Sequence, residues 1–438
     1  MSIFNKHLPA IHVPHYKNTM NMPTEKMPVP NKVRISMSQH IGAPCTPTVA
    51  VGDTVKVGQV IGDTGAFVSA PIHSSVSGKV TAIEQEMSLA GNWEDVIVIV
   101  PDKKQEVIED LAPPQINSRE DFIKAVRESG MVGLGGAAFP THVKYNPKNI
   151  DEVDTLIING AECEPFITSD YRTMLEDTDL IVNGIKNVMK HLNLKNCVIG
   201  IEDNKPIAIE KLATALEKNP EIRVQALQSN YPQGGERVLI YETTGRSLPV
   251  GKLPADIGVI VSNVATIVAL ERYLETGMPL ISKKLTVDGS AIKRPKNIEV
   301  LIGTAISDVI AFCGGYRRVP RKIIMGGPMM GRAIYKDSLP IIKNNNAILA
   351  FDEDWAGIPK ETPCINCGRC ARACSMRLVP TAIYKAYENK DIDDLKALNV
   401  ALCMECGSCS YVCPAKKPLS FMNKFAKAEV AKAAKGGK

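Results

Sequence analysis

The strongest constraint on the fold is a pair of cysteine runs near the C-terminus. Eight of the twelve cysteines lie beyond residue 363. They form the runs Cys364-x2-Cys367-x2-Cys370-x3-Cys374 and Cys403-x2-Cys406-x2-Cys409-x3-Cys413. Twin runs of this spacing are typical of bacterial proteins that hold two [4Fe–4S] clusters, in which the fourth cysteine of each run ligates the other cluster. The two runs are therefore expected to fold as one unit.

The same rule divides the eight cysteines into two ligand sets. The first cluster is predicted to bind Cys364, Cys367, Cys370 and Cys413, and the second Cys403, Cys406, Cys409 and Cys374. Zinc is the alternative, but zinc sites use four ligands in two CxxC pairs rather than this longer run twice. Ser375 follows Cys374 where the ferredoxin pattern has proline, and a helical segment separates the runs. We therefore expect a more helical fold than that of a small ferredoxin.

Composition narrows the class of protein. The formal net charge is +5, which weakly favours acidic partners and does not indicate nucleic acid. No run of about 18 apolar residues exists, and the N-terminus has no apolar core of a secretion signal. We expect a cytoplasmic protein without a transmembrane span. The remaining cysteines are isolated and are expected to be buried or free thiols: Cys45, Cys163, Cys197 and Cys313.

Four regions follow from apolar patterning and turn signals. Residues 1–115 contain short β-like runs, and the stretch 51–83 resembles the hybrid barrel of lipoyl and biotinyl carriers, without the carrier lysine in its hairpin. Residues 116–275 alternate helix and strand patterns, which predicts an open α/β sheet. Residues 276–350 fit a small α+β domain. Residues 351–438 hold a linker, the cysteine runs and a basic tail.

A glycine-rich loop, GLGGAAFPTHVK, occupies residues 133–144. Glycines let the backbone approach a ligand closely, and a loop followed by a helix presents N–H donors to a phosphate. Lys144 at its end would neutralise that phosphate. A lone loop of this kind is more often an ordinary turn, so the motif by itself leaves both interpretations open.

An acidic turn, NGAECEP, follows the predicted strand TLIING at residues 155–160. Carboxylates at the carboxyl end of a strand lie where open α/β sheets bind ligands. Glu162 and Glu164 would accept hydrogen bonds there from ribose or amide groups. A solvated acidic turn is the alternative. A third element, YPQGGER, occupies residues 231–237.

In order and spacing, these motifs resemble the NADH-oxidising flavoprotein subunits of complex I. GLGGAAFPTHVK is similar to that family's GRGGAGFPTGxK loop, NGAECEP to NADEGEP, YPQGGER to Y-x-x-G-E-E, and SNVAT (262–266) to NNVET. The resemblance implies non-covalent FMN with its phosphate on the glycine loop, NAD(H) as substrate, and no catalytic side chain beyond the flavin. The cofactor-binding residues that it implies are Gly133, Gly135, Gly136, Phe139, Lys144, Asn159, Glu162, Glu164, Tyr231, Gly234, Glu236, Asn263 and Thr266.

The complex I flavoprotein has neither this barrel nor twin cysteine runs. Over almost its full length the chain resembles the C-subunit family of Rnf (Rsx) electron-transport complexes. This resemblance implies a multidomain α/β plus β fold: a lipoyl/biotinyl-like hybrid barrel, a Rossmann-like FMN/NADH domain, a β-grasp (SLBB) domain and a ferredoxin-like helical domain with two [4Fe–4S] clusters. It also implies a part in ferredoxin:NAD oxidoreduction coupled to Na⁺ or H⁺ translocation.

The resemblance further implies partners and a location. The partners are the other Rnf membrane subunits, NADH or NAD, and indirectly ferredoxin, with no nucleic acid. The location is peripheral, on the cytoplasmic face of the cell membrane. Two alternatives stay open: a non-enzymatic iron–sulfur relay with a vestigial nucleotide site, and a flavoprotein subunit of a soluble NAD-linked hydrogenase or formate dehydrogenase. The N-terminal barrel argues against the second.

Overall fold

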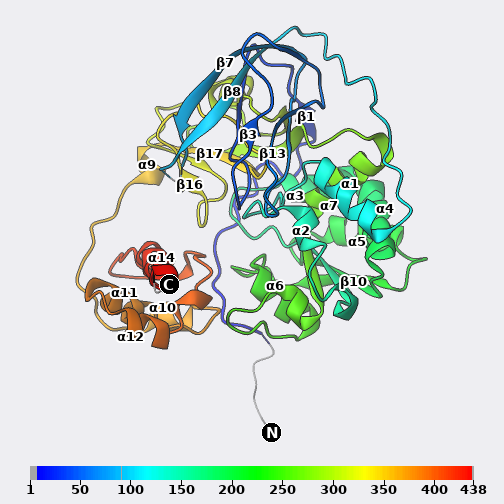
Figure 1. Cartoon of the computed structure of the whole chain (residues 1–438). Coiled ribbons are helices and arrows are strands. Elements are labelled where there is room, and N and C mark those ends of the chain that lie inside the picture. Colours follow the sequence, from blue (N-terminus) through cyan, green and yellow to red (C-terminus); the bar gives the residue numbers. More distant parts are fainter. Residues whose placement is uncertain (1–6, 90, 437–438) are drawn as a thin grey trace.

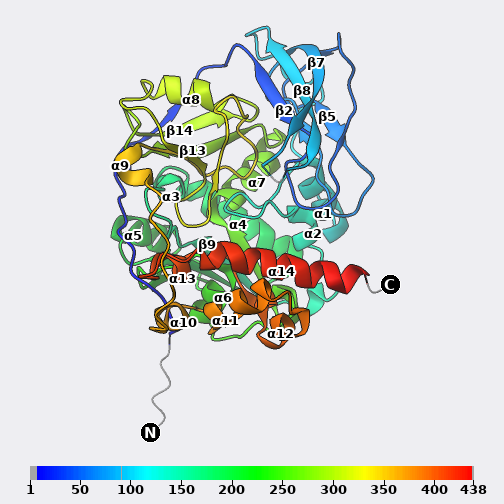
Figure 2. The same cartoon turned by 90° about the vertical axis from the view of Figure 1, so that its left-hand side faces the viewer.

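The computed structural model describes residues 7–89 and 91–436. A large body and a smaller lobe are joined by an extended linker at the left of Figure 1. The body contains the barrel, the α/β domain and a third sheet, and the lobe contains the C-terminal helices. In the view of Figure 2, helix α14 (Leu419–Gly436) runs across the lobe toward the C-terminus.

The N-terminal barrel consists of two small sheets around one apolar core. Their strand orders are β2-β8-β7-β4 and β3-β5-β6. Alternate residues of the long hairpin point inward, and Val80, Ile97 and Ile99 are fully buried, as strand geometry requires. The strands are β2 (Val33–Ser36), β3 (Thr46–Pro47), β4 (Thr54–Val55), β5 (Val60–Asp63), β6 (Ile72–His73), β7 (Gly78–Met87) and β8 (Trp93–Pro101).

The α/β domain has a four-stranded parallel sheet in the order β11-β10-β9-β12. Its strands are β9 (Thr155–Gly160), β10 (Asn196–Glu202), β11 (Ile222–Leu227) and β12 (Val259–Asn263). Strands this rich in Val and Ile are buried on both faces by helices. The helices are α1 (Arg119–Glu128), α2 (Thr141–Lys144), α3 (Ser169–Glu176), α4 (Thr178–Leu192), α5 (Pro206–Ala215), α6 (Glu236–Thr244) and α7 (Val264–Thr276), with 3₁₀ turns η1 (Ile150–Glu152) and η2 (Pro254–Ile257).

The third sheet has six strands in the order β1-β14-β13-β17-β15-β16. Strand β1 comes from the first region of the sequence and pairs in parallel with β14. The boundary at residue 115 stays a prediction, although this strand lies in the sheet of the third region. The elements are β1 (Thr24–Lys26), β13 (Ser282–Asp288), β14 (Lys296–Leu301), α8 (Ile306–Phe312), β15 (Lys322–Met325), β16 (Arg332–Ala333) and β17 (Ala347–Phe351).

The N-terminal lead-in ties these domains together. Ile11 and Tyr231 exchange two backbone hydrogen bonds, with N–O distances of 2.9 and 2.8 Å. Farther along, the Nζ of Lys17 donates to the carbonyl oxygens of Glu162, Glu164 and Ile167 at 2.8, 2.9 and 2.6 Å. Burial lowers the pKa of Lys17. Hydrogen bonds therefore hold this irregular, proline-rich segment against the body.

The lobe is helical, as the spacing between the cysteine runs predicts. Helix α14 packs on α11 and α12, with Ala426 fully buried between them. The elements from the linker onward are α9 (Glu353–Ala356), α10 (Arg369–Arg372), α11 (Pro380–Glu388), α12 (Ile392–Ala397), η3 (Val400–Leu402), α13 (Ser408–Tyr411) and α14.

Within the described ranges, no helix has the length and apolar character needed to cross a bilayer. The predicted combination of a barrel, a Rossmann-like α/β domain, a β-grasp-type sheet and a helical cysteine domain is confirmed.

Candidate functional site

The carboxyl ends of two neighbouring parallel strands define the first site. In sequence order the strands of the α/β sheet stand 3-2-1-4, so the chain reverses direction across the sheet between β9 and β12. Open α/β sheets bind ligands in the crevice at such a switch point. Asn159, the residue before the last of β9, lies beside Asn263, its partner in register at the end of β12. Both were predicted as cofactor-binding residues, and the structure brings them together here.

The glycine loop lies over this point and is held from three domains. Its Leu134 N–H donates to Oγ1 of Thr266 at 3.0 Å, within the α/β domain. The Nζ of Lys283, in the third sheet, donates to the Leu134 carbonyl oxygen at 2.7 Å. From the barrel, Ile41 N–H donates to the carbonyl oxygen of Ala138 at 3.1 Å. Hydrogen bonds from the barrel and from the third sheet thus hold in place a loop that belongs to the α/β domain.

The exposed part of the loop has free backbone donors. Gly135, Gly136 and Ala137 are exposed, and their N–H groups donate to no acceptor in the described part of the chain. A side chain at Gly135 would collide with Asn263, because its Cβ would lie 2.6 Å from the Asn263 Cγ. Successive free amides form a concavity that binds anions. These residues fit the phosphate of FMN.

Two charged side chains flank the loop. The Nζ of Lys144 lies 3.6 Å from a carboxylate oxygen of Glu236, the first residue of α6, and donates to the carbonyl oxygen of Val261 at 2.9 Å. Both side chains keep part of their surface in solvent. Phe139 is half-buried, and its carbonyl oxygen accepts from Gly133 N–H at 2.9 Å. Glu236, a predicted cofactor contact from α6, is therefore close to Lys144 at the end of the glycine loop.

The acidic turn is arranged differently. One oxygen of Glu162 accepts from Asp170 N–H at 2.8 Å, at the start of α3. The carboxylate of Glu164 accepts from the N–H groups of Met329 and Met330, at 3.0 and 2.9 Å. Burial raises the pKa of both glutamates to about 7, and Lys17 opposes the rise. Their contact with a cofactor stays a prediction, since these oxygens already accept from backbone amides.

The turn at residues 231–237 connects the α/β domain to the lobe. The buried Tyr231 donates its hydroxyl hydrogen to the carbonyl oxygen of Cys406 at 2.7 Å. Gly234 accepts at its carbonyl oxygen from Asn159 Nδ2 at 2.9 Å. The side chain of Met404 packs close to where a Cβ at Gly235 would lie, 3.4 Å away. The turn that was predicted to bind the nucleotide therefore also contacts the loop of the second cysteine run.

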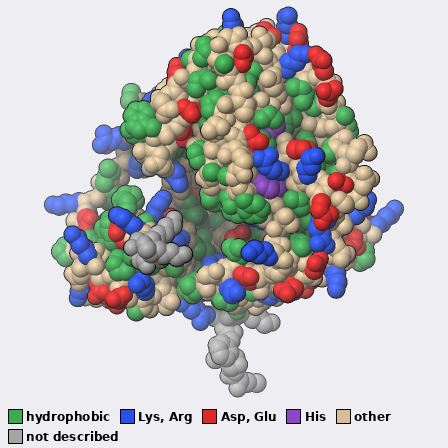
Figure 3. All heavy atoms as spheres, in the orientation of Figure 1, with side chains coloured by type: hydrophobic (Ala, Val, Ile, Leu, Met, Phe, Trp, Pro, Cys, Tyr) green, Lys and Arg blue, Asp and Glu red, His purple; other side chains and the backbone are tan. Residues whose placement is uncertain are grey.

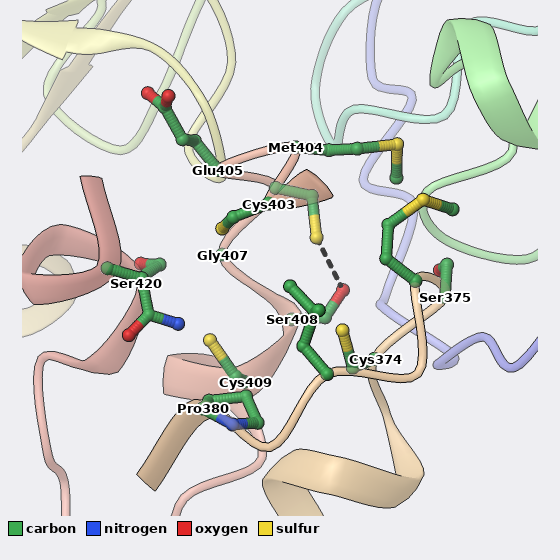
Figure 4. Close-up of a pocket in the computed structure, with 14 residues that line it drawn as sticks. Cys374, Ser375, Pro380, Cys403, Met404, Glu405, Gly407, Ser408, Cys409 and Ser420 are labelled. Atoms are coloured by element: carbon green, nitrogen blue, oxygen red, sulfur yellow. Dashed lines mark hydrogen bonds between the residues drawn. The ribbon is translucent and has the colours of Figure 1, made fainter. Parts of the chain in front are cut away.

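That cysteine loop forms the second site. Cys374 of the first run lines one pocket together with Cys403, Cys406 and Cys409 of the second. Figure 4 shows the labelled cysteines directing their sulfur atoms toward a common hollow. The buried Ser375 Oγ and Asn423 Oδ1, which belong to lining residues, have no hydrogen-bond partner in the described chain. Four thiols with polar groups around them fit an iron–sulfur cluster.

The two runs have the same backbone course. Left-handed φ angles occur at equivalent positions: Asn366 and Glu405 (52° and 58°), Gly368 and Gly407 (70° and 84°), and Arg377 and Lys416 (54° and 55°). Each glycine stands before a short helix, α10 or α13. Cys370 and Cys413 of the first ligand set pack with Cys409 of the second, whereas Cys364 is exposed. The two sets therefore meet inside the lobe.

Several residues that build these sites were not predicted from the sequence. Four of them are far in sequence from the groups that they contact: Lys17, Met329, Met330 and Asn344. The Nδ2 of Asn344, for example, donates to the Gly136 carbonyl oxygen at 2.8 Å. Lys283 did carry a signal, because it shares the inward face of β13 with the buried Leu285 and Val287. Burial lowers the pKa of Lys283 to about 8.

Known protein families match four regions of this chain. Family models match at residues 8–104 (RnfC Barrel sandwich hybrid domain), 126–272 (Nuo51 FMN-binding domain), 284–333 (SLBB domain) and 363–417 (4Fe-4S dicluster domain). A solved NAD⁺-reducing [NiFe]-hydrogenase chain has a TM-score of 0.49 at 18% identity, over 72% of this chain and 61% of that chain.

Three relatives match over most of the chain and show its family. The RnfC-type subunit of the proton-translocating ferredoxin:NAD(+) oxidoreductase complex of Clostridium ljungdahlii is 47% identical, over 84% of this chain and 81% of that protein. The corresponding protein of the Na(+)-translocating complex of Acetobacterium woodii is 41% identical, over 90% and 89%. That of the ion-translocating oxidoreductase complex of Rhodobacter capsulatus is 38% identical, over 85% and 73%. The chain therefore belongs to the RnfC family of ion-translocating ferredoxin:NAD oxidoreductase complexes.

Proposed function

We propose that this chain is the NAD(H)-handling flavo-iron-sulfur subunit of an ion-translocating ferredoxin:NAD oxidoreductase. The observation that carries the proposal is that a single turn lies beside the glycine loop and also contacts the cysteine pocket. A loop with free amides stands at the switch point of the α/β sheet, and the turn beside it contacts a pocket lined by four cysteines through Tyr231.

The glycine loop is suited to hold FMN. The amides of Gly135, Gly136 and Ala137 are free to bind its phosphate, and Lys144 adds a positive charge at the edge of the loop. When bound, FMN exchanges a hydride with NAD(H) and passes electrons singly, which is what connects a two-electron carrier to iron–sulfur clusters. The protein binds and orients these groups and keeps the loop in position from three domains.

NAD(H) is expected at the open side of the same loop. Phe139 offers an aromatic face there, and Glu236 is the one predicted glutamate whose side chain keeps substantial exposure, at 45%. Asn263 and Thr266 position the loop rather than the nucleotide, since their side chains contact the loop or buried neighbours. Tyr231 positions the cysteine loop in the same sense, and Gly234 holds the side chain of Asn159 through its carbonyl oxygen.

The second ligand set (Cys374, Cys403, Cys406 and Cys409) is the one that receives electrons from the flavin site. Its loop contacts Tyr231 through Cys406, and its Gly407 lies against Met329, in the segment between β15 and β16. The first ligand set (Cys364, Cys367, Cys370 and Cys413) lies beyond it and includes the exposed Cys364. Electrons therefore pass from the α/β domain to the second cluster and then to the first, or in the reverse order.

The other subunits of the membrane complex are the partners of this chain, and ferredoxin is coupled to it through them. We place the protein peripherally, on the cytoplasmic face of the cell membrane. This location supports a direct exchange with the cellular NAD(H) pool. The relatives' names include both a proton- and a sodium-translocating complex.

Anaerobic purification followed by NADH titration tests the proposal. About one FMN and eight irons per chain are expected, the iron count following from two cubane clusters. NADH should bleach the flavin band and then the iron–sulfur band. Iron without flavin, with no response to NADH, would contradict the proposal and favour a cluster relay with a vestigial nucleotide site.

A further inference from the structure

We propose that an open groove on the lobe, here called the cationic groove, docks an acidic redox domain of another subunit, which exchanges single electrons with the first cluster. This inference rests on the function proposed above. The groove has a volume of about 470 Å³ and lies where the lobe meets the N-terminal segment, and its lining includes Ile11, Arg369, Arg372, Tyr411, Cys413 and Lys416.

The charge of the groove is uncompensated. Arg369, Arg372 and Lys416 line it, and none of them forms an ion pair with any described residue. The only hydrogen bond among the three side chains within the described chain runs from Arg372 Nη2 to the carbonyl oxygen of Cys367, at 3.0 Å. Other lysines on this lobe have acidic partners, such as Lys417 with Glu361 and Lys427 with Glu405. Three free cations around one groove favour an anionic occupant.

A ligand of the first cluster forms part of the groove. Cys413 is 8% exposed and lines it together with Arg369 and Lys416. The loop of the second cluster faces the body instead, toward Tyr231 and Met329. A protein seated in the groove would therefore approach the cluster that includes Cys413. The buried Cys413 thus links the wall of the groove to this cluster.

The remaining lining residues suit a protein rather than a small anion. Tyr411, which lines the groove, is 48% exposed, and Ala10, Val412 and Pro414 add apolar surface to the lining. Interfaces combine tyrosine and arginine anchors with apolar contact area, and a positive patch meets a negative one. Figure 3 shows an opening between the lobe and the body.

Charge reversal tests the groove. Holo protein carrying Arg369→Glu and Lys416→Glu is compared with wild type and with a matched variant, Lys385→Glu plus Lys390→Glu, whose side chains belong to the same lobe but do not line the groove. The probe is the detergent-solubilised complex of the remaining subunits, and binding is measured at increasing KCl. The groove variant should bind about tenfold more weakly at low salt and lose its salt dependence, while the matched variant binds like wild type.

Binding is measured without NADH, so that failure of the proposed function is seen separately, in the flavin and iron content and the NADH titration. Equal affinity of the groove variant and wild type would overturn the docking site, and so would an equal loss in the matched variant. Binding of wild type to phosphatidylglycerol vesicles but not to the subunits, abolished by the groove variant, would overturn the protein partner in favour of a membrane surface.

A different observation supports a second inference. We infer that Ser375 and Asn423 donate hydrogen bonds to sulfur atoms of the second cluster and raise its reduction potential. Both line its pocket, both are at most 2% exposed, and the Ser375 hydroxyl and the Asn423 amide oxygen have no partner in the described chain. A buried polar group without a partner costs free energy. Cluster sulfur atoms are acceptors, so they can accept directly from the Ser375 hydroxyl. They accept from Asn423 when its amide is turned so that Nδ2, rather than Oδ1, faces them.

The repeat within the lobe gives this inference an internal control. The residue equivalent to Ser375 is Pro414, after Cys413 of the other ligand set, and proline has neither a hydroxyl nor an N–H. Hydrogen bonds to sulfur are among the determinants of cluster potential. Only the second cluster therefore gains a donor at this position.

Redox titrations followed by EPR on Ser375→Ala and Asn423→Leu holo proteins test the inference. Each variant should lower the midpoint potential of one cluster and leave the other unchanged, at an unaltered iron content. A tenfold change in the reduction equilibrium corresponds to about 59 mV for one electron. Unchanged potentials in Ser375→Ala, or equal shifts of both clusters, would refute the donor role. The milder serine variant keeps the test open if Asn423→Leu fails to bind iron.

Discussion

Replacing Gly135 by alanine should destabilise the α/β domain even before any cofactor binds. The added Cβ would lie 2.6 Å from Cγ and 3.0 Å from Cβ of Asn263. Asn263 cannot move freely, because its Oδ1 accepts from Ala265 N–H at 2.9 Å as the N-cap of α7 and its Nδ2 donates to Asp170 at 2.7 Å. Overpacking of this kind costs about 1–3 kcal/mol, and loss of the cap adds about 1 kcal/mol.

The neighbouring Gly136 provides the matched control. A Cβ at Gly136 meets nothing within 4 Å, so Gly136→Ala should leave the free energy of unfolding of the apo protein unchanged. Hydrogen exchange of the α7 backbone amides, with mass-spectrometric detection of residues 259–276, reports this domain without interference from the others. Gly135→Ala should speed exchange there and Gly136→Ala should not. Both should bind FMN more weakly, since each adds a methyl group to the loop that is proposed to hold the phosphate.

Equal exchange rates in Gly135→Ala and wild type would refute the steric argument. A loss of protection in Gly136→Ala as large as that in Gly135→Ala would also contradict it, because that result would mean that any side chain disrupts the loop.

Three further predictions follow from the contacts around the turns. Tyr231→Phe removes the hydrogen bond to Cys406 and should cost about 1 kcal/mol, seen in guanidinium unfolding, and slow flavin-to-cluster electron transfer in stopped flow. Burial raises the pKa of Glu164 from 4.5 to about 7. The protonated carboxyl therefore contributes its full stabilisation below pH 4.5, and this contribution is lost as the pH rises through about 7. Glu164→Gln should reduce the pH dependence of the unfolding midpoint over this interval, and an unchanged pH dependence would contradict the argument. Cys374→Ser should abolish the EPR signal of the cluster held by Cys403, Cys406 and Cys409 and spare the other, whereas loss of the signal of its own run alone would contradict crossed ligation.

Patterns that are local in sequence were sufficient for much of the fold. The alternation of helix and strand signals located the parallel sheet, and Ser118 accepts from Asp121 N–H at 3.0 Å as the N-cap of α1. The cysteine spacing divided the thiols into two sets, and the structure brings Cys374 to the pocket of the other run. Such features depend on few neighbours, so residue type and spacing determine them.

Contacts between domains were not predictable in the same way. Nothing in the sequence marks the N–H groups of Met329 and Met330 as partners of Glu164, because every residue except proline has the same backbone donor. Strand β1 pairs with β14 across most of the chain, as Thr24 with Asn297. Nothing in the sequence of the basic tail indicated that α14 supplies Asn423 to the pocket of the second ligand set. Tertiary packing decides these positions.

The order of reduction after NADH is added tests the central claim most directly. Anaerobic holo protein is mixed with NADH and freeze-quenched at increasing times, and EPR spectra of wild type and Cys374→Ser identify the two clusters. We predict that the cluster bound by Cys374, Cys403, Cys406 and Cys409 is reduced before the cluster that includes Cys413, and that the flavin band bleaches before both. Reduction of the Cys413 cluster first, or of either cluster in protein without flavin, would contradict the route from the glycine loop through the Tyr231 contact.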